Sequence, residues 1–161
     1  MVNKQEEVTT QWAQVESEYQ RRADLIPNLV STVKGYASHE QETFTAVTEA
    51  RSKATQVTVN PEDLTEESIQ QFQEAQGQLS SALGKLLMIR ENYPELKANQ
   101  NFLALQDELA GTENRIAVER NRFNEFARDY NQYIRRFPHV IYAGWFGFKK
   151  KGYFEADAGA Q

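Results

Sequence analysis

The longest helical pattern in the chain is FLALQDELAGTENRIAVERNRFNEFARDYNQYIRRF, residues 102–137. Its core positions recur in alternating steps of four and three residues, which places them on one face of a helix. They are Phe102, Gln106, Leu109, Glu113, Ile116, Arg120, Phe123, Ala127, Tyr130, Ile134 and Phe137. The spacing continues without a shift across Gly111. The helix is expected to end before Pro138, because the residue before a proline is disfavoured in a helix. One helix near residues 96–137 is therefore predicted to pack against other helices.

Three further helices are predicted from the same spacing, near residues 4–34, 39–57 and 63–91. The first carries Val8, Trp12, Val15, Tyr19, Ile26, Leu29 and Val33, with Arg22 in the missing core position. The second carries Phe44, Val47, Arg51 and Ala54, and the third carries Ile69, Phe72, Gln76, Leu79, Leu83, Leu86 and Arg90. Short connections between neighbouring helices predict an antiparallel, all-α four-helix bundle.

Two features of the first helix leave alternatives open. Gly35 and the pair Ser38 and Gln41 indicate a break between two helices. The alternative is one continuous helix over residues 4–57, which would be about 80 Å long. Pro27 lies inside the pattern and predicts a kink, because it removes the hydrogen bond to the carbonyl of Ala23. The neighbouring Asp24 and Asn28 are expected to satisfy the freed backbone groups, and Asp24 alternatively caps a restarted helix.

Composition excludes several classes of protein. The 161 residues contain 18 Lys and Arg against 23 Asp and Glu, and this net charge of −5 argues against nucleic acid as a partner. There is no cysteine, so a disulfide framework and a thiolate site are excluded. No run approaches the roughly 18 apolar residues of a membrane span, and no signal peptide stands at Met1, so the chain as given is expected to be soluble.

Catalytic and metal-binding motifs are scarce. The two histidines are His39 and His139, and the residues three positions before them are Tyr36 and Arg136, whereas a di-iron bundle needs Glu-x-x-His. Glycine-rich phosphate loops and nucleophile elbows are also missing from the sequence. No catalytic, cofactor-binding or metal-binding residue is therefore predicted, although a Ser-His-Asp site assembled in space remains an alternative.

Four charged residues occupy predicted core positions: Arg22, Glu40, Glu113 and Arg120. An unpaired charge in the core costs several kcal/mol, so each should find a partner or a wet gap between helices. We interpret them as an interior salt-bridge layer, a structural polar core that fixes helix register. The alternative is a ligand or metal pocket that uses Glu40 and Glu113.

Residues 138–161 form a different segment, rich in aromatic residues and without helical period. It contains YAGWFGFKKKGYF, residues 142–154, in which three lysines lie between aromatic clusters. Such segments suit a membrane interface or an acidic partner, and they also suit packing against the bundle. The candidate contact residues are Trp145, Phe146, Phe148, Lys149, Lys150 and Lys151. We therefore divide the chain into a bundle at residues 1–137 and a tail at 138–161, packed on the bundle or at the membrane.

Several stretches resemble the LemA family over nearly the whole chain. The most specific is YQRRADLIPNLV (residues 19–30), which continues through VKGY (33–36), His39-Glu40 and Glu49-Ala-Arg51. Further stretches follow in the family's order: YPELK (93–97), residues 102–109, TENRI (112–116), Asn124, Tyr130-Asn131, Phe137-Pro138, Gly147-Phe148 and Tyr153-Phe154. The resemblance implies a helical bundle at a bacterial membrane, and it supplies no catalytic residue.

The resemblance also implies a location. Family members usually carry an N-terminal transmembrane helix that ends before a segment like VNKQEEV, residues 2–8. This chain lacks that anchor, so we expect a soluble portion of a longer protein or a variant without the anchor. The family's anchor generally leaves the bundle on the cytoplasmic side, with exposure to the envelope as the alternative.

The expected function is that of a non-enzymatic adaptor or scaffold, tethered to the bacterial membrane, without a cofactor. Its expected partners are membrane or envelope proteins, or the membrane surface itself. One alternative is a hydrolase or small-ligand-binding protein with a polar site around Arg22, Glu40 and Glu113. Another is lipid-surface binding through the tail.

Overall fold

The computed structural model describes residues 2–135 and 150–154, and over these residues it contains helices and turns but no strand. Four of the helices are long: α1 (Val2–Lys34), α2 (Gln41–Gln56), α3 (Glu66–Met88) and α5 (Gln100–Arg135). The short helix η1 (Pro61–Asp63) lies between α2 and α3, and η2 (Ile89–Asn92) and α4 (Pro94–Lys97) lie between α3 and α5. The predicted all-α class is confirmed, and α4 is a short fifth α-helix that the spacing did not predict.

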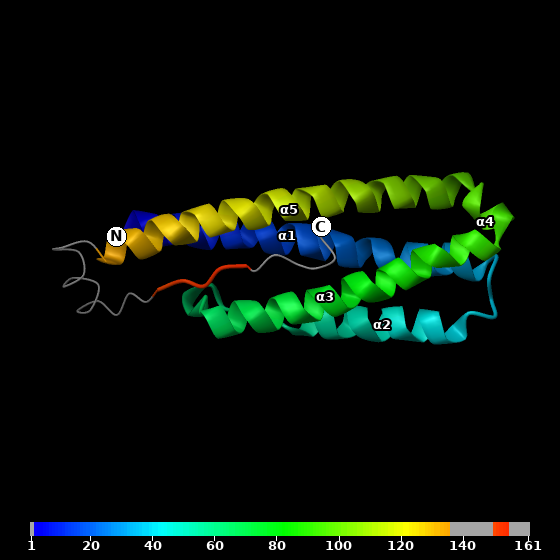
Figure 1. Cartoon of the computed structure of the whole chain (residues 1–161), viewed down its shortest axis with the longest axis horizontal. Coiled ribbons are helices and arrows are strands. Elements are labelled where there is room, and N and C mark those ends of the chain that lie inside the picture. Colours follow the sequence, from blue (N-terminus) through cyan, green and yellow to red (C-terminus); the bar gives the residue numbers. More distant parts are fainter. Residues whose placement is uncertain (1, 136–149, 155–161) are drawn as a thin grey trace.

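The helices are arranged in two pairs. Helix α1 packs along α5, and α2 packs along α3 (Figure 1). With 33 residues, α1 is about 50 Å long. Helix α5 runs antiparallel to α1 and ends beside the start of α1, whereas α4 and the α1–α2 turn lie at the opposite end (Figure 1). The bundle is therefore a rod, with the first and last described helical turns at one end.

The break after α1 excludes the single helix over residues 4–57. Helix α1 ends at Lys34 and α2 begins at Gln41, two residues later than predicted. The side chain of Gln41 donates to the carbonyl of Ser38 (2.9 Å), so this pair closes the turn rather than capping a helix at residue 39. Helix α3 begins at Glu66 because the hydroxyl of Thr65 accepts the N–H of Ser68 (3.2 Å).

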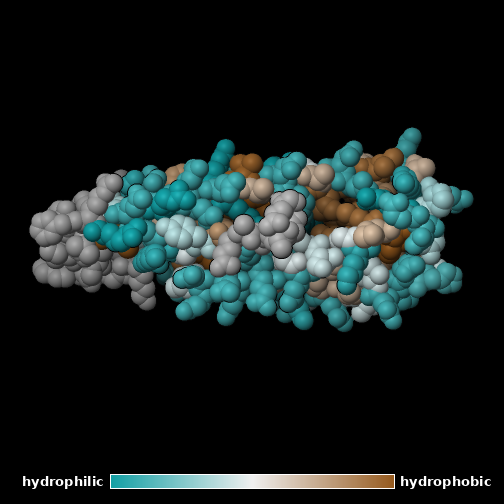
Figure 2. All heavy atoms as spheres, viewed as in Figure 1, coloured by the Kyte–Doolittle hydropathy of each residue, from teal (hydrophilic) through white to brown (hydrophobic). Residues whose placement is uncertain are grey.

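The interior consists of two hydrophobic cores. The proximal core lies near the start of α1 and includes Val8, Trp12, Val15, Tyr19, Leu64, Ile69, Phe72, Ile116, Phe123, Ala127, Tyr130 and Phe154. The distal core lies toward α4 and includes Ile26, Leu29, Val33, Phe44, Val47, Leu79, Leu83, Leu86, Leu96, Phe102 and Leu109. All apolar positions predicted for the first helix are buried. Figure 2 shows a largely hydrophilic surface over these cores.

Within residues 2–135 and 150–154, every helix is too short or too polar to cross a lipid bilayer.

Candidate functional site

Arg22 stands at the level where the two cores meet. Along α1 it separates Tyr19 of the proximal core from Ile26 of the distal core. Its side chain is only 2% exposed, and the guanidinium lies over the ring of Tyr19, 5.1 Å from the centroid. Burying a guanidinium costs free energy unless its N–H groups are hydrogen-bonded. The hydrogen-bond partners of Arg22 therefore determine whether its burial destabilises the bundle.

Two helices, α3 and α5, supply those partners. On α3, the carbonyl and the side-chain Oε1 of Gln76 accept from Nη2 at 2.9 and 2.8 Å. The hydroxyl of Ser80 accepts from Nη1 at 2.7 Å. On α5, Oε1 of Glu113 accepts from Nη1 at 3.1 Å. We call Arg22, Gln76, Ser80 and Glu113 the polar layer; the structure therefore brings together two of the four charged core residues named from the sequence.

The other members of the predicted set lie differently. Glu113 pairs with Arg22, but its side chain is 41% exposed, so water also reaches the carboxylate. Glu40 is half-buried at the start of α2, where its backbone carbonyl accepts the N–H of Phe44 (3.2 Å), and it is not part of the polar layer. Arg120 is also half-buried and lies over the ring of Phe154 at 4.9 Å. Of the four charged residues named from the sequence, Arg22 is buried, whereas Glu40, Glu113 and Arg120 are half-buried.

Sequence reasoning missed a second set of polar contacts between α1 and α5. Nε of Arg115 lies 3.0 Å from Oε1 of Glu18, and Nη2 of Arg115 donates to the hydroxyl of Thr112 at 3.0 Å. Closer to the start of α1, the side chain of Gln11 donates to the backbone carbonyl of Glu119 at 3.1 Å. The sequence does show that Glu18 lies one helical turn before Arg22, on the same face of α1, and this position could have suggested a contact with α5.

Pro27 produces a contact that the sequence did not predict. Helix α1 continues through Pro27, whose missing N–H leaves the carbonyl of Ala23 without its usual partner. Nε of Arg51, from α2, donates to that carbonyl at 2.8 Å. Of the two expected local partners, Asp24 instead accepts from the side chain of Gln20 at 2.9 Å. Arg51 therefore joins α2 to α1 at a backbone group that proline exposes.

A cavity of about 290 Å³ lies beside the polar layer, between α1, the end of α2 and α3. Its lining residues include Glu16, Tyr19, Gln20, Thr55, Phe72 and Gln76. Burial raises the pKa of the Glu16 carboxyl, and the indole of Trp12 opposes the rise. The Nε1 atom of Trp12 has no partner at hydrogen-bond geometry among the described residues. The cavity is a partly polar site without a catalytic arrangement among its described lining residues.

Residues 150–154, which we call the strap, pack against the bundle. The side-chain amide of Asn131 donates to the carbonyl of Lys151 (2.9 Å), and the N–H of Lys151 donates to Oδ1 of Asn131 (2.6 Å). Asn124 repeats this two-point contact with the carbonyl (3.1 Å) and the N–H (2.8 Å) of Phe154. The N–H of Gly152 donates to the carbonyl of Leu64 at 3.0 Å. The strap is thereby fixed to α5 and to the loop before α3.

The strap also completes the proximal core. The ring of Phe154 stacks on Trp12 at 5.8 Å and meets Phe123 edge-on at 5.5 Å. Lys151 is 5% exposed, and its Nζ lies 5.3 Å from the ring centroid of Tyr130. Burial lowers the pKa of Lys151, and Asp63 opposes this effect. Burial also raises the pKa of Tyr130 to about 12.

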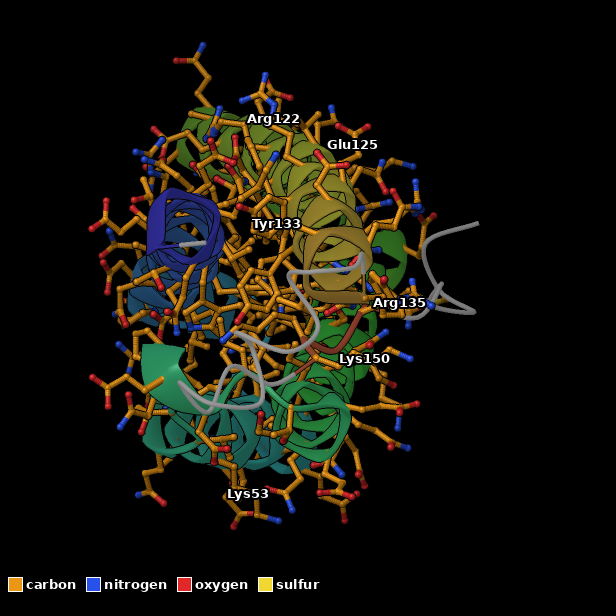
Figure 3. All side chains as sticks on the ribbon, turned by 90° about the vertical axis from the view of Figure 1, so that its left-hand side faces the viewer. Lys53, Arg122, Glu125, Tyr133, Arg135 and Lys150 are labelled. Carbon is orange, nitrogen blue, oxygen red and sulfur yellow. The ribbon has the colours of Figure 1, made fainter. Side chains whose placement is uncertain are left out.

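This placement changes the candidate membrane contacts. Lys151 faces the bundle interior, because its backbone is held by Asn131 and its ammonium lies over Tyr130. Lys150 is exposed, on the same side of the end-on view as Arg135 (Figure 3). The remaining candidates, Trp145, Phe146, Phe148 and Lys149, lie outside the described residues, as does most of the proposed tail domain. Among the described residues, no group of three or more His, Asp and Glu side chains is arranged to hold a metal.

Comparison with known proteins places these features in a family. The model of the LemA family matches residues 11–161, which include the polar layer, Arg51 and the strap. Magnetosome protein MamQ of Magnetospirillum gryphiswaldense is 29% identical over 160 residues, covering 87% of this chain and 58% of that protein. Protein LemA of Metamycoplasma hominis is 25% identical over 137 residues, covering 85% of this chain and 59% of that protein. This chain thus spans less than three-fifths of either relative, yet the family match covers almost all of it. The chain belongs to the LemA family.

Proposed function

We propose that the bundle is a non-enzymatic adaptor that holds two sites a fixed distance apart at a bacterial membrane. The proposal rests on the hydrogen bonds that the buried guanidinium of Arg22 makes to other helices. Both terminal nitrogens of Arg22 are bonded to Gln76, Ser80 and Glu113, on two other helices. Polar groups that hold helices together in this way are structural, and of the three guanidinium nitrogens the buried Nε alone has no partner among the described residues.

The shape of the molecule supports the same function. Helix α1 is continuous from Val2 to Lys34, so an anchor before it would transmit its position along about 50 Å of helix. Family membership supports such an anchor in the whole protein. The end of the bundle near α4 would then project away from the membrane, where a partner can reach it.

Exposed hydrophobic side chains favour that far end as the partner surface. Met88 at the end of α3 is 66% exposed, Leu103 near the start of α5 is 42% exposed, and Tyr36 in the α1–α2 turn is 38% exposed. Figure 2 shows hydrophobic atoms at the surface between α5 and α3 in this half of the bundle. Exposed apolar groups that gather in one region are typical of protein interaction sites.

Site-specific photo-crosslinking of the full-length protein in its own membrane tests this proposal. A photoreactive residue at Met88 or Leu103 should capture a discrete protein, whereas one at the exposed position Lys53 on α2 should not. The proposal fails if all three positions capture the same background, or if Met88 and Leu103 capture lipid alone.

A small-ligand-binding protein is the second candidate, because the cavity of about 290 Å³ adjoins Gln76 of the polar layer. Its aromatic lining and its carboxylate, Glu16, would suit a small organic cation. Native mass spectrometry of protein purified without denaturant would detect a retained molecule. Loss of that molecule in Glu16→Gln, with the fold intact, would favour this candidate over the adaptor.

A further inference from the structure

We propose that the groove occupied by the strap is a peptide-binding site, and that it also accepts the strap of a second copy of this chain. The groove is formed by α5, the start of α3 and the loop before it. This proposal goes beyond the adaptor function and does not depend on a membrane tether.

The groove recognises a polypeptide backbone. Asn124 and Asn131 are seven residues apart, which is about 10.5 Å along a helix. The backbone groups that they bind belong to residues 154 and 151, which are three residues apart, or about 10 Å of extended chain. Each amide donates to the carbonyl and accepts from the N–H of one residue of the strap, and Asn131 also donates to the hydroxyl of Tyr153 at 2.9 Å. The two spacings match, so α5 presents a regular pair of sites for an extended peptide.

The groove also selects side chains. At Gly152 a Cβ atom would lie 2.6 Å from Cα of Glu66, so only glycine fits there. Two residues later, Phe154 is enclosed by the rings of Trp12, Phe72 and Phe123. Before the glycine, Lys151 is buried over Tyr130. The groove therefore selects the pattern Lys-Gly-x-Phe.

A second copy is the occupant that this pattern favours. Lys-Gly-x-Phe occurs once in the sequence, at residues 151–154, and every copy of the chain carries it. Among the described residues, the contacts that hold the strap are made with α1, α3, α5 and the loop before α3, so the same contacts form whichever copy supplies it. Fourteen residues connect Arg135 to Lys150, a length of chain that reaches up to about 50 Å. When two copies exchange an identical segment, each segment enters a groove that already fits it, so no additional matching surface is required.

A pair of complementary variants tests the exchange. The first variant, Gly152→Val with Phe154→Ala, removes the strap from its own groove and leaves the groove intact. The second, Asn124→Ala with Asn131→Ala, damages the groove and leaves the strap intact. The fluorescence of Trp12 reports on occupancy because Phe154 stacks on its ring. Trp145→Phe is therefore added to both variants, and Trp12→Phe to the second, so that only the first variant emits.

Alone, the first variant should show a Trp12 emission maximum shifted to longer wavelength than that of the Trp145→Phe protein with its strap unchanged. Adding the second variant should reverse the shift and give a 1:1 complex by light scattering. A mixture that behaves as the sum of its components at about 100 μM would overturn the proposal. Unchanged emission from the first variant alone would overturn it too, because the strap would then not shield Trp12.

A synthetic peptide provides an independent measurement if the second variant does not fold. The peptide KKKGYFE, residues 149–155, should reverse the shift of the first variant, and the same peptide with valine at the glycine position should bind at least tenfold more weakly. Circular dichroism checks that the first variant keeps its helices, and Phe154→Ala alone is the milder form if it does not. Equal binding of the two peptides, or no binding at millimolar concentration, would contradict the selection of Lys-Gly-x-Phe.

Discussion

Replacement of Arg51 by methionine is expected to destabilise the bundle through a single backbone carbonyl. Pro27 has no N–H, so the carbonyl of Ala23 is bonded instead by Nε of Arg51, at 2.8 Å. A buried carbonyl left without a donor costs about 1–3 kcal/mol. Because Arg51 is half-exposed and water can partly replace it, we expect a loss of about 1.5 kcal/mol. With a urea m-value of about 2 kcal/mol per M, the unfolding midpoint would fall by about 0.7 M.

The second half of this prediction uses Pro27→Ala. Alanine restores the N–H that bonds the carbonyl of Ala23 within the helix, so Arg51 should matter less in this background. The double-mutant cycle should give a coupling of about 1 kcal/mol between positions 27 and 51. Urea unfolding of the four chains, followed by circular dichroism at 222 nm, measures it.

Lys53→Met is the matched control for Arg51→Met. Lys53 also lies on α2, and its side chain points outward from the bundle (Figure 3). Its replacement should change the free energy of unfolding by less than about 0.5 kcal/mol. The reasoning is refuted if Arg51→Met costs the same with Pro27 and with alanine at that position, since the cost would then not come from the freed carbonyl.

Three further predictions concern the polar layer and the contact between Tyr130 and the strap. Glu113→Gln should cost about 1 kcal/mol, because Arg22 keeps an acceptor but loses the opposite charge and the carboxylate is partly exposed. Glu125→Gln, at an exposed site on α5, is its control, and equal urea midpoints would show that the charge of Glu113 is not engaged. Because burial raises the pKa of Tyr130 to about 12 from 10, stability should fall between pH 10 and 12, by about 1 kcal/mol at pH 11. Tyr130→Phe should remove this loss in urea titrations at each pH; an undiminished loss would contradict it. Burial lowers the pKa of Lys151, so the contribution of Lys151 to stability should increase with pH up to about 10.5, and Lys151→Met should abolish that increase.

Much of the bundle could be predicted because its core positions are periodic. In α1 the apolar positions from Val8 to Val33 are all buried, and the one interruption, Arg22, lies in the core as its phase requires. Gln76 interrupts the stripe of α3 in the same way and is also buried, so it was available as a partner for Arg22. Period alone thus identifies the buried apolar residues of α1, whereas in α5 the predicted positions Glu113 and Arg120 are only half-buried.

The pairing between helices could not be predicted, because it depends on how far each helix is displaced along its axis. Pro27 and Arg51 were both visible in the sequence, but only the axial position of α2 brings Nε of Arg51 to the carbonyl of Ala23. Glu40 and Arg120 followed the same spacing rule as Arg22, yet they lie where the core gives way to a turn and to the strap. The strap has no helical period, so its signal was indirect: two asparagines seven residues apart on α5.

The polar layer also explains how four stripes of similar hydrophobic residues adopt one axial register. Sliding α5 by one heptad, about 10.5 Å, would still place apolar residues against α1. It would, however, exchange Glu113 for Gln106 in one direction and for Arg120 in the other, so Arg22 would face a neutral amide or a like charge. Sliding α3 by a heptad would replace Gln76 with Ile69 or Leu83 and leave buried guanidinium donors without acceptors. One buried arginine therefore penalises these heptad-shifted arrangements of α3 and α5, and such a fixed register is what the proposed adaptor would need to keep its two ends a constant distance apart.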